Sequence, residues 1–306
     1  MDMVQLGNTD LKVSRLGVGL VEIGLQLTEN NKDQAYDLLN TALEGGINFF
    51  DTAECYGISE DLIGEALSDK RDKFILATKA GHPSYGTEGV RWQVDTIKKS
   101  IDRSLKRLKT DYVDILQMHA YDIFGEPPDE VVQVFLDAKR DGKTRYIGYS
   151  QENEEAVWAI KSGLFDTIQT AFNMMDQRAL FEILDEASKA GMGVIAKRPI
   201  GNGMWGRAFK KSDHYEDTVA KSLRVRAEKI QSLGPIKTEP ENHILAALGF
   251  VLHHPQIHTA IVGSRNPKHV KSNIDMVNEQ LPIASEYVEE LHKRYEIVGS
   301  HWRSID

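Results

Sequence analysis

Residues 47–79 read INFFDTAECYGISEDLIGEALSDKRDKFILATK, and they contain one complete unit of the pattern that runs along the whole chain. The two ends, 47–51 and 74–79, are short runs rich in β-branched and aromatic residues, which are typical of buried strands. Between them, SEDLIGEALSD at 59–69 has the apolar spacing of an amphipathic helix. The stretch therefore predicts a strand, a helix and a second strand in succession.

The same alternation continues in both directions along the chain. Further strands are predicted at 16–19, 113–119, 146–150, 167–171, 193–197 and 259–263. The stretches between them, for example AYDLLNTALEGG and VVQVFLDAKRDGK, are amphipathic, and several end on glycine as helix C-termini often do. Strands and helices that alternate in this way over 306 residues predict an α/β fold, in which a single domain, residues 1–306, forms a parallel (β/α)8 or TIM barrel.

Two segments depart from the alternation. The first, VQLGNTDLKVS at 4–14, predicts a β-hairpin with a polar turn at 7–10, which we expect to plug the floor of the barrel. The second is a long irregular insertion at 201–240, between the seventh and eighth strands. A loop of that length inside a compact domain is usually functional.

Composition limits the kinds of partner. The net charge of -9 is not typical of a protein with a large nucleic-acid footprint. The single cysteine, Cys55, excludes an internal disulfide and suits a reducing cytosol. No signal-peptide pattern or membrane-spanning apolar run is present. We expect a cytoplasmic protein that acts on a small molecule, and the sequence does not indicate its oligomeric state.

Charged and polar residues end three consecutive predicted strands, at the face where barrels of this kind carry their active sites. They are Asp51, Lys79 and His119, and Tyr56 lies in the loop after the first of these strands. A lysine charge favours a nearby phenolate, an aspartate holds the lysine charged, and a histidine can orient a carbonyl oxygen or relay a proton. Singly, each residue also fits a turn, a strand-end lysine or a core histidine. Together they predict proton transfer to an oxygen that gains negative charge.

These residues lie in five motifs: DTAECYGISEDLIGEAL, ILATKAG, DILQMHAYD, IGYSQ and IQTAFN. In order and spacing, over essentially the whole chain, the motifs resemble those of the aldo-keto reductases. The resemblance implies that Asp51, Tyr56, Lys79 and His119 form a catalytic tetrad, with Tyr56 as general acid in reduction. It also implies a nicotinamide cofactor that binds extended across the barrel mouth, without a Rossmann fold, and a small carbonyl or sugar substrate.

The resemblance also assigns the nicotinamide end of the cofactor site. Ser150 and Gln169 are implied at the carboxamide, with a second, shifted contact at Gln151, where the family often has asparagine. Many members place an aromatic residue on the nicotinamide ring, and that position falls on Lys197 within AKRPIGNG. The stacking surface must therefore differ in this chain. Three further expected cofactor contacts in the same motif are Arg198, Ile200 and Gly201.

The residues expected around the substrate are fewer. Two aromatic positions that line the pocket in many members fall on Val21 and Gly81, which predicts a roomier carbonyl pocket. Tyr121 and Trp205 are further candidates for substrate contact. Trp205 has an equally good alternative role as the residue that anchors its own loop.

IVGSRNPKHVKSN, residues 261–273, predicts the phosphate end of the site. Asn266 and Pro267 form a helix start, as N-cap and first helical residue, and such an N-terminus can hold an anion. The alternative is a well-capped surface helix. The resemblance places the adenosine end of the cofactor near Gly263, Ser264, Arg265, His269 and Asn273.

The charges of this segment bear on the choice of cofactor. Arg265 and Lys268 suggest a 2′-phosphate and so favour NADP(H). Gly263 and His269, however, stand where many members have a lysine and an arginine, which leaves NAD(H) open.

Three other motifs are interpreted as structural. GNGMWG at 201–206 matches GxGxxG, but RAFKKSDHYEDT follows it without the apolar period of a packing helix, so a Rossmann unit is not predicted. Its glycines are expected to shape a loop over the pyrophosphate. HHPQIH at 253–258 is not read as a metal site, because proline interrupts the helix and a helix C-terminus suits histidines. KKSIDRSLKRLK at 98–109 is an amphipathic helix on the barrel, and not a nucleic-acid site.

A different class of function stays open from the sequence. Potassium-channel β subunits are relatives of the same family, and they keep the cofactor site while they act as regulators. A redox-sensing binding protein is therefore the alternative to an enzyme. The intact tetrad favours the enzyme, and tight cofactor binding with poor turnover would favour the sensor.

Overall fold

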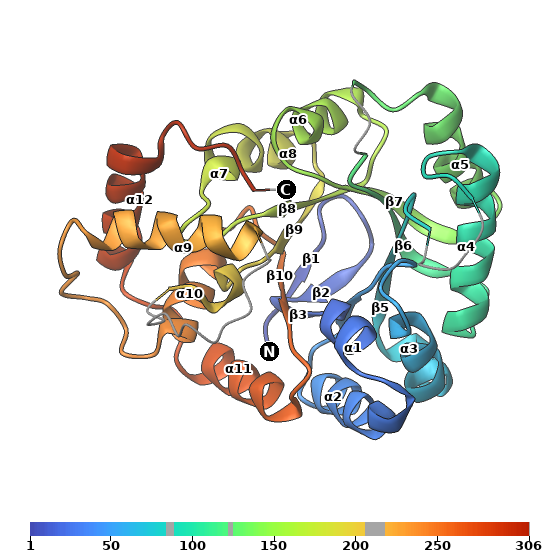
Figure 1. Ribbon diagram of the computed structural model, residues 1–306, viewed down its shortest axis with the longest axis horizontal. Coiled ribbons are helices and arrows are strands. Elements are labelled where there is room, and N and C mark those ends of the chain that lie inside the picture. Colours follow the sequence, from blue (N-terminus) through green and yellow to red (C-terminus); the bar gives the residue numbers. More distant parts are fainter. Residues whose placement is uncertain (84–88, 122–124, 206–217, 306) are drawn as a thin grey trace.

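The computed structural model describes residues 1–83, 89–121, 125–205 and 218–305, and in this part of the chain eight parallel strands close into a barrel (Figure 1). In order around the barrel the strands are β10 (Thr259–Gly263), β3 (Leu16–Gly19), β4 (Phe49–Asp51), β5 (Ile75–Ala80), β6 (Val113–His119), β7 (Thr144–Ser150), β8 (Thr167–Ala171) and β9 (Gly193–Lys197). The predicted (β/α)8 barrel is confirmed, with strand ends within about two residues of those expected, which is the usual uncertainty of such boundaries.

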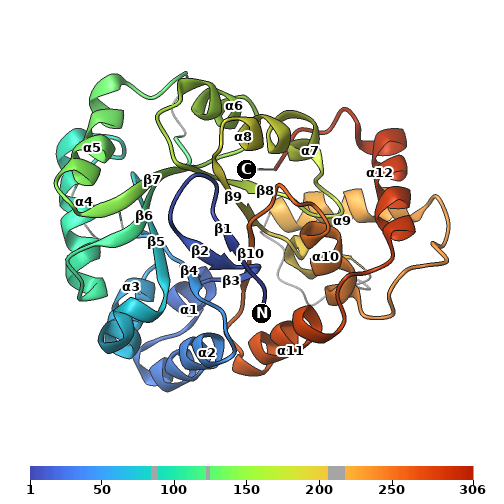
Figure 2. The same cartoon turned by 180° about the vertical axis from the view of Figure 1, so that it is seen from behind.

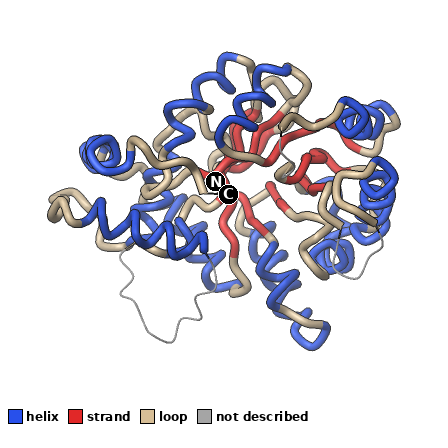
Figure 3. Tube along the Cα trace, turned by 45° about the horizontal axis from the view of Figure 1, so that its top comes forward, coloured by secondary structure: helices blue, strands red, loops and turns tan. Residues whose placement is uncertain are grey.

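Helices surround the strands, as Figure 3 shows. They are α1 (Val21–Gln26), α2 (Lys32–Glu44), α3 (Ser59–Leu67), α4 (Val94–Leu108), α5 (Asp129–Arg140), α6 (Asn153–Ser162), α7 (Arg178–Glu182), α8 (Leu184–Lys189), α9 (Thr218–Gln231), α10 (His243–Leu252), α11 (Pro267–Glu279) and α12 (Ser285–Gly299). Helix α4 is the basic amphipathic helix expected from the sequence: Ile97, Ile101 and Leu108 are buried, while Lys98 and Lys99 are exposed. In the described ranges no helix is long and apolar enough to cross a membrane.

The predicted hairpin is formed by β1 (Met3–Gln5) and β2 (Lys12–Ser14), which pair in antiparallel fashion. Its Leu6, Leu11 and Val13 pack in one buried cluster with inward side chains of the barrel strands. Gly7 lies so close to the chain at Gly193 that an added Cβ would be 2.3 Å from that backbone nitrogen. Figure 2 shows the hairpin in the middle of the ring of strands, so the prediction that it closes the barrel floor is confirmed.

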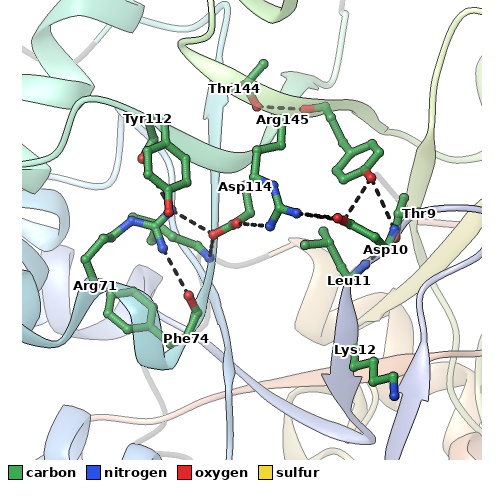
Figure 4. A network of polar contacts seen from close by, with 12 residues as sticks. Thr9, Asp10, Leu11, Lys12, Arg71, Phe74, Tyr112, Asp114, Thr144 and Arg145 are labelled. Atoms are coloured by element: carbon green, nitrogen blue, oxygen red, sulfur yellow. Dashed lines mark hydrogen bonds and ion pairs between the residues drawn. The ribbon is translucent and has the colours of Figure 1, made fainter.

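An ion network ties the hairpin to the strands (Figure 4). Asp114 on β6 accepts hydrogen bonds from Arg71 at 2.7 Å, Arg145 at 2.9 Å and the backbone N–H of Leu76 at 2.9 Å. Arg145 also reaches Asp10 in the hairpin turn, at 2.7 Å and 2.8 Å. Strands β5, β6 and β7 are therefore joined to the hairpin at one end of the barrel.

The insertion at 201–240 is only partly irregular, so that expectation was wrong for α9. Leu223, Ala227 and Ile230 of this helix are buried, because they form an apolar stripe in an otherwise polar sequence. The turn Gly201–Gly203 forms a short 3-10 helix directly after the barrel strand β9. Strand β9 pairs with β8 and β10, so residues 201–205 of GNGMWG follow a strand of the barrel and not of a Rossmann unit. Residues 206–217, which include most of RAFKKSDHYEDT, lie outside the described part.

Candidate active site

Lys79 and Asp51 form a buried ion pair at the carboxyl ends of the adjacent strands β5 and β4. The exposed fraction is 1% for Lys79 and 2% for Asp51. Lys79 donates to Asp51 Oδ2 and, at 2.9 Å, to the carbonyl oxygen of Thr52. Burial, the largest single cause, would lower the pKa of Lys79, but the charge and hydrogen bond of Asp51 together with the charges of Tyr56 and Cys55 outweigh it and the pKa is raised. The ammonium therefore stays charged inside the barrel.

The second oxygen of Asp51 is held by two amides that belong to other strands. Gln117 on β6 and Gln169 on β8 each donate to Oδ1, at 2.9 Å and 2.8 Å. Gln117 was missed in the sequence, although it stands two residues before His119 and so points to the same face of β6. Three strands thus fix the carboxylate from three sides.

Tyr56 lies beside Lys79, with the lysine Nζ 5.0 Å from the centre of the phenol ring. Its ring also meets the ring of His119 edge to face, with centroids 5.6 Å apart. Burial raises the pKa of Tyr56, and the charge of Lys79 opposes this only in part. We expected the lysine to lower this pKa below its ordinary value, and the net direction is the opposite because burial is the larger effect. The phenol is therefore protonated and ready to give a proton.

His119 is a neutral imidazole with a protonated thiol beside it. Burial and the charge of Lys79 lower the pKa of His119 well below its usual 6.5. The Sγ atom of Cys55 lies 3.5 Å from Nδ1, and burial raises the pKa of this thiol to about 11. Because the thiol is a donor in this state, we infer that Nδ1 accepts and that the ring proton is on Nε2.

The expected nicotinamide residues continue the polar network away from Asp51. Ser150 donates its hydroxyl hydrogen to Gln169 Oε1 at 3.2 Å and lies 3.4 Å from Lys197 Nζ. Lys197 pairs with Glu152 at 2.9 Å, a carboxylate that the sequence reasoning did not single out. Burial lowers the pKa of Lys197, and the charge of Glu152 opposes that shift. An ion pair thus stands where an aromatic residue was implied by the family pattern.

The other residues expected near the nicotinamide form hydrogen bonds within the protein. Gln151 donates to the carbonyl oxygen of Tyr121 at 3.4 Å and accepts from the N–H of Glu152. Arg198 donates to the carbonyl oxygen of Ile305, which ties the C-terminal tail to the end of β9. Ile200 and Gly201 form the turn after that strand, with φ of 51° at the glycine.

The predicted phosphate end is a cleft of about 760 Å³. Its lining is Gln34, Asp37, Gly263, Ser264, Arg265, Asn266, Pro267 and His269. Helix α11 begins as predicted, with the Asn266 side chain accepting from the N–H of Lys268 at 3.0 Å. Arg265, Lys268 and His269 are exposed, whereas Asn273 is buried in the helix. A capped helix start with three exposed basic or titratable side chains fits an anionic ligand such as a phosphate.

Glu22 on α1 is a second carboxylate that the sequence reasoning missed. A Cβ added to Gly263 would lie 2.3 Å from both of its carboxylate oxygens, so the glycine leaves room for Glu22. Its Oε2 is buried and has no hydrogen-bond partner in the described part of the chain. Burial raises the pKa of this carboxyl. No simple motif marks the contact, because it joins the ends of distant segments.

Of the substrate candidates, Tyr121 lies in an aromatic cluster with Trp92 and His82, and His82 adjoins His119 at 5.2 Å between ring centroids. An added Cβ on Gly81 would lie 2.3 Å from the indole of Trp92, so the expected extra room is wrong at this position. Trp92 packs against His82 at 5.2 Å and Tyr121 at 4.9 Å between ring centroids. Val21 is partly exposed at the start of α1.

Trp205 fits the anchoring role that the sequence left open. It is only 4% exposed, and its indole N–H donates to Glu239 at 2.8 Å. In HHPQIH, His254 also makes contacts within the protein. It bonds the carbonyl oxygen of Phe250 at 2.9 Å and lies 3.2 Å from His292. Across residues 1–83, 89–121, 125–205 and 218–305, no three histidine, cysteine, aspartate or glutamate side chains are grouped to hold a metal ion.

Comparisons with known proteins point to one family. The model of the Aldo/keto reductase family matches residues 15–293. The L-galactose dehydrogenase of Arabidopsis thaliana is 30% identical and the match covers 91% of this chain and 89% of that protein. The 6-dehydroglucose reductase of Novosphingobium aromaticivorans is 32% identical over 85% of each. The holo form of an aldo-keto reductase from Bacillus halodurans superimposes with a TM-score of 0.80, at 29% identity and 96% coverage of both chains.

Proposed function

Since the chain belongs to the aldo/keto reductase family, we propose that it uses a nicotinamide cofactor to reduce an aldehyde or ketone to an alcohol, or to run the reverse oxidation, for example of a sugar. Membership makes the protein an oxidoreductase. The observation that carries the proposal is the convergence of Lys79 and His119 on Tyr56, with Lys79 paired to the buried Asp51.

The residues of the chain manage the proton of this reaction. When bound, the cofactor supplies a hydride to the carbonyl carbon, and negative charge then develops on the oxygen. Tyr56, protonated and beside a cation, gives its proton to that oxygen. Lys79 stabilises the phenolate that remains, and His119 donates from Nε2 to orient the same oxygen.

The position of the cofactor follows from the two polar regions of the mouth. We propose that Ser150 and Gln169 hold the carboxamide, since they adjoin Asp51 and so the reacting atoms. The phosphates would lie in the cleft at the start of α11, beside Gly263. Arg265 and Lys268 favour NADP(H), because either can pair with a 2′-phosphate. The carboxylate of Glu22 lies next to this region and opposes the phosphates.

The substrate proposal stays at the level of chemical class. Two relatives are named for sugars, one as a dehydrogenase of L-galactose and one as a reductase of 6-dehydroglucose. Small sugars and their aldehydes or ketones are therefore the first compounds to compare with simple carbonyl compounds. Trp92 and Tyr121 supply an aromatic wall beside His82.

The test follows the absorbance of the reduced nicotinamide, with NADPH and NADH in parallel, over aldehydes, ketones and sugars. Wild type and Tyr56→Phe are compared side by side, with cofactor binding measured by quenching of protein fluorescence. We expect turnover in the wild type and its loss, by about 10²-fold or more, in Tyr56→Phe with binding intact. Equal turnover by the two proteins would exclude Tyr56 as the proton donor. Tight binding without turnover in the wild type would favour the redox sensor, and no binding would exclude both functions.

A further inference from the structure

Lys197 and Glu152 form an ion pair at the mouth of the barrel that the proposed proton transfer does not use. Lys197 Nζ lies 2.9 Å from Glu152 Oε1. The side chain of Glu152 is 1% exposed and that of Lys197 is 17% exposed, so the positive end of the pair is the end open to the mouth. Glu152 also accepts from the N–H of Ala171 at 3.2 Å, which fixes the carboxylate to the end of β8.

Stability does not account for this pair. Taking two charges out of water costs free energy that their mutual attraction often fails to recover, so apolar side chains of similar size are commonly at least as stable. The pair is also not needed to complete the barrel, because β9 pairs along its length with β8 and in part with β10. Its placement beside the tetrad is therefore better explained by chemistry at the mouth.

A continuous series of contacts joins Lys197 to the tetrad. The lysine lies 3.4 Å from Ser150 Oγ, Ser150 donates to Gln169 at 3.2 Å, and Gln169 donates to Asp51 at 2.8 Å. The ammonium is thus one hydrogen-bond length from the hydroxyl that we propose to hold the carboxamide. A nicotinamide ring in that position would have a cation as a close neighbour.

The two states of the cofactor respond differently to such a neighbour. The nicotinamide ring is neutral when reduced and carries a positive charge when oxidised. A nearby cation therefore raises the free energy of the oxidised form and leaves that of the reduced form nearly unchanged, while Glu152 offsets part of this effect.

From this geometry, and resting on the proposed function, we propose that Lys197 makes the site prefer the reduced nicotinamide over the oxidised one. The protein would then release the oxidised cofactor readily after a reduction. In the direction of alcohol oxidation, the same preference would weaken binding of the starting cofactor.

The experiment measures the dissociation constants of the reduced and oxidised cofactors by titration calorimetry. It uses NADP(H) or NAD(H), whichever the wild type binds more tightly. The variants are Lys197→Met and the double variant Glu152→Gln/Lys197→Met. In the double variant the amide oxygen can still accept from Ala171, so no buried carboxylate is left without its cation. Lys189→Met on α8 is the control, since it makes the same charge change on a side chain that is 72% exposed.

We expect the preference for the reduced form to fall roughly tenfold in Lys197→Met and by a smaller factor in the double variant, which also loses the offsetting charge of Glu152, in both cases mainly through tighter binding of the oxidised form. The control should keep the wild-type ratio. The inference is overturned if both variants fold, as judged by circular dichroism and thermal unfolding, and keep that ratio. A wild type that binds neither cofactor would overturn the proposed function, and this inference with it, whereas binding with an unchanged ratio in the variants removes this inference alone.

Discussion

The two ends of the barrel each bury a carboxylate that is paired with a cation, but the cations differ. At the floor, Asp114 is held by Arg71 and Arg145, and the guanidinium of Arg71 lies 4.5 Å from the centre of the Tyr112 ring. At the mouth, Asp51 is held by Lys79. Arginine keeps its proton at any ordinary pH, whereas a buried lysine responds to its surroundings and tunes neighbouring groups.

The neighbours of the two pairs complete the contrast. The floor pair contacts backbone groups and the hairpin turn, and it joins strands to one another. The mouth pair stands beside a tyrosine and a histidine whose pKa values are both displaced by burial. We therefore propose that similar ion pairs serve architecture at one end and proton transfer at the other, according to what lies next to them.

The largest expected effect tests the mouth. Lys79→Met removes the cation that stabilises the phenolate, so kcat should fall by about 10²–10⁴-fold. Cofactor binding, measured by fluorescence quenching, should persist because the proposed contacts to the cofactor are made by other residues. A variant that keeps its kcat would show that the lysine has only a structural role, like its counterpart at the floor.

The matched change at the floor is Arg71→Met. It removes the bonds from Arg71 to Asp114 and to the carbonyl oxygens of Phe74 and Tyr112. We expect the free energy of unfolding, from urea titration, to fall by about 3 kcal/mol, with kcat of the folded protein unchanged. Loss of kcat without loss of stability would break the assignment of the floor network to architecture.

A third polar pair, His254 and His292, sharpens the comparison because it joins the end of α10 to α12 and not the barrel strands. Burial lowers the pKa of His254 to about 4, and also lowers that of His292 to about 4. Because both values are below the ordinary 6.5, the unfolded chain binds protons first as the pH falls. The stability contribution is therefore complete above pH 6.5 and is lost between about pH 6.5 and 4.

We expect the free energy of unfolding to fall by on the order of 3 kcal/mol for each ring over that window. Thermal unfolding at a series of pH values measures it, with His292→Gln as the comparison because it removes one of the two titrating rings. A pH profile that is the same in the variant and the wild type would exclude the pair as the source. Turnover at pH 7 should be unaffected in the variant.

The smallest expected effect concerns the phosphate end of the mouth. Glu22→Gln removes a negative charge beside Gly263, so cofactor binding should tighten by roughly tenfold at low salt. Glu289→Gln on the exposed face of α12 is the control, because it makes the same chemical change elsewhere. Weaker binding in Glu22→Gln would instead indicate that the carboxylate accepts a hydrogen bond from the cofactor.

Several departures from the sequence-based expectations share one cause: each depends on a contact between residues that are not neighbours in the chain. Trp92 fills the space beside Gly81, Glu22 fills that beside Gly263, and Glu152 pairs with Lys197. No periodicity or motif in the sequence marks these contacts, because each of them forms only in the folded barrel. The direction of the Tyr56 pKa shift was missed for the same reason, since burial is a property of the assembled barrel.

The sequence by itself determined the order of strands and helices, the hairpin at the floor and the four residues that we propose as the tetrad. Local apolar periods specify each element, and parallel strands in a barrel bring their carboxyl ends to one face, so strand-end residues such as Asp51, Lys79 and His119 had to be neighbours. Only the tertiary structure decided which side chains surround them, which charges are buried and which titratable side chains keep their protons. Those outcomes depend on desolvation and on contacts between distant segments, and neither is encoded in any single stretch of the chain.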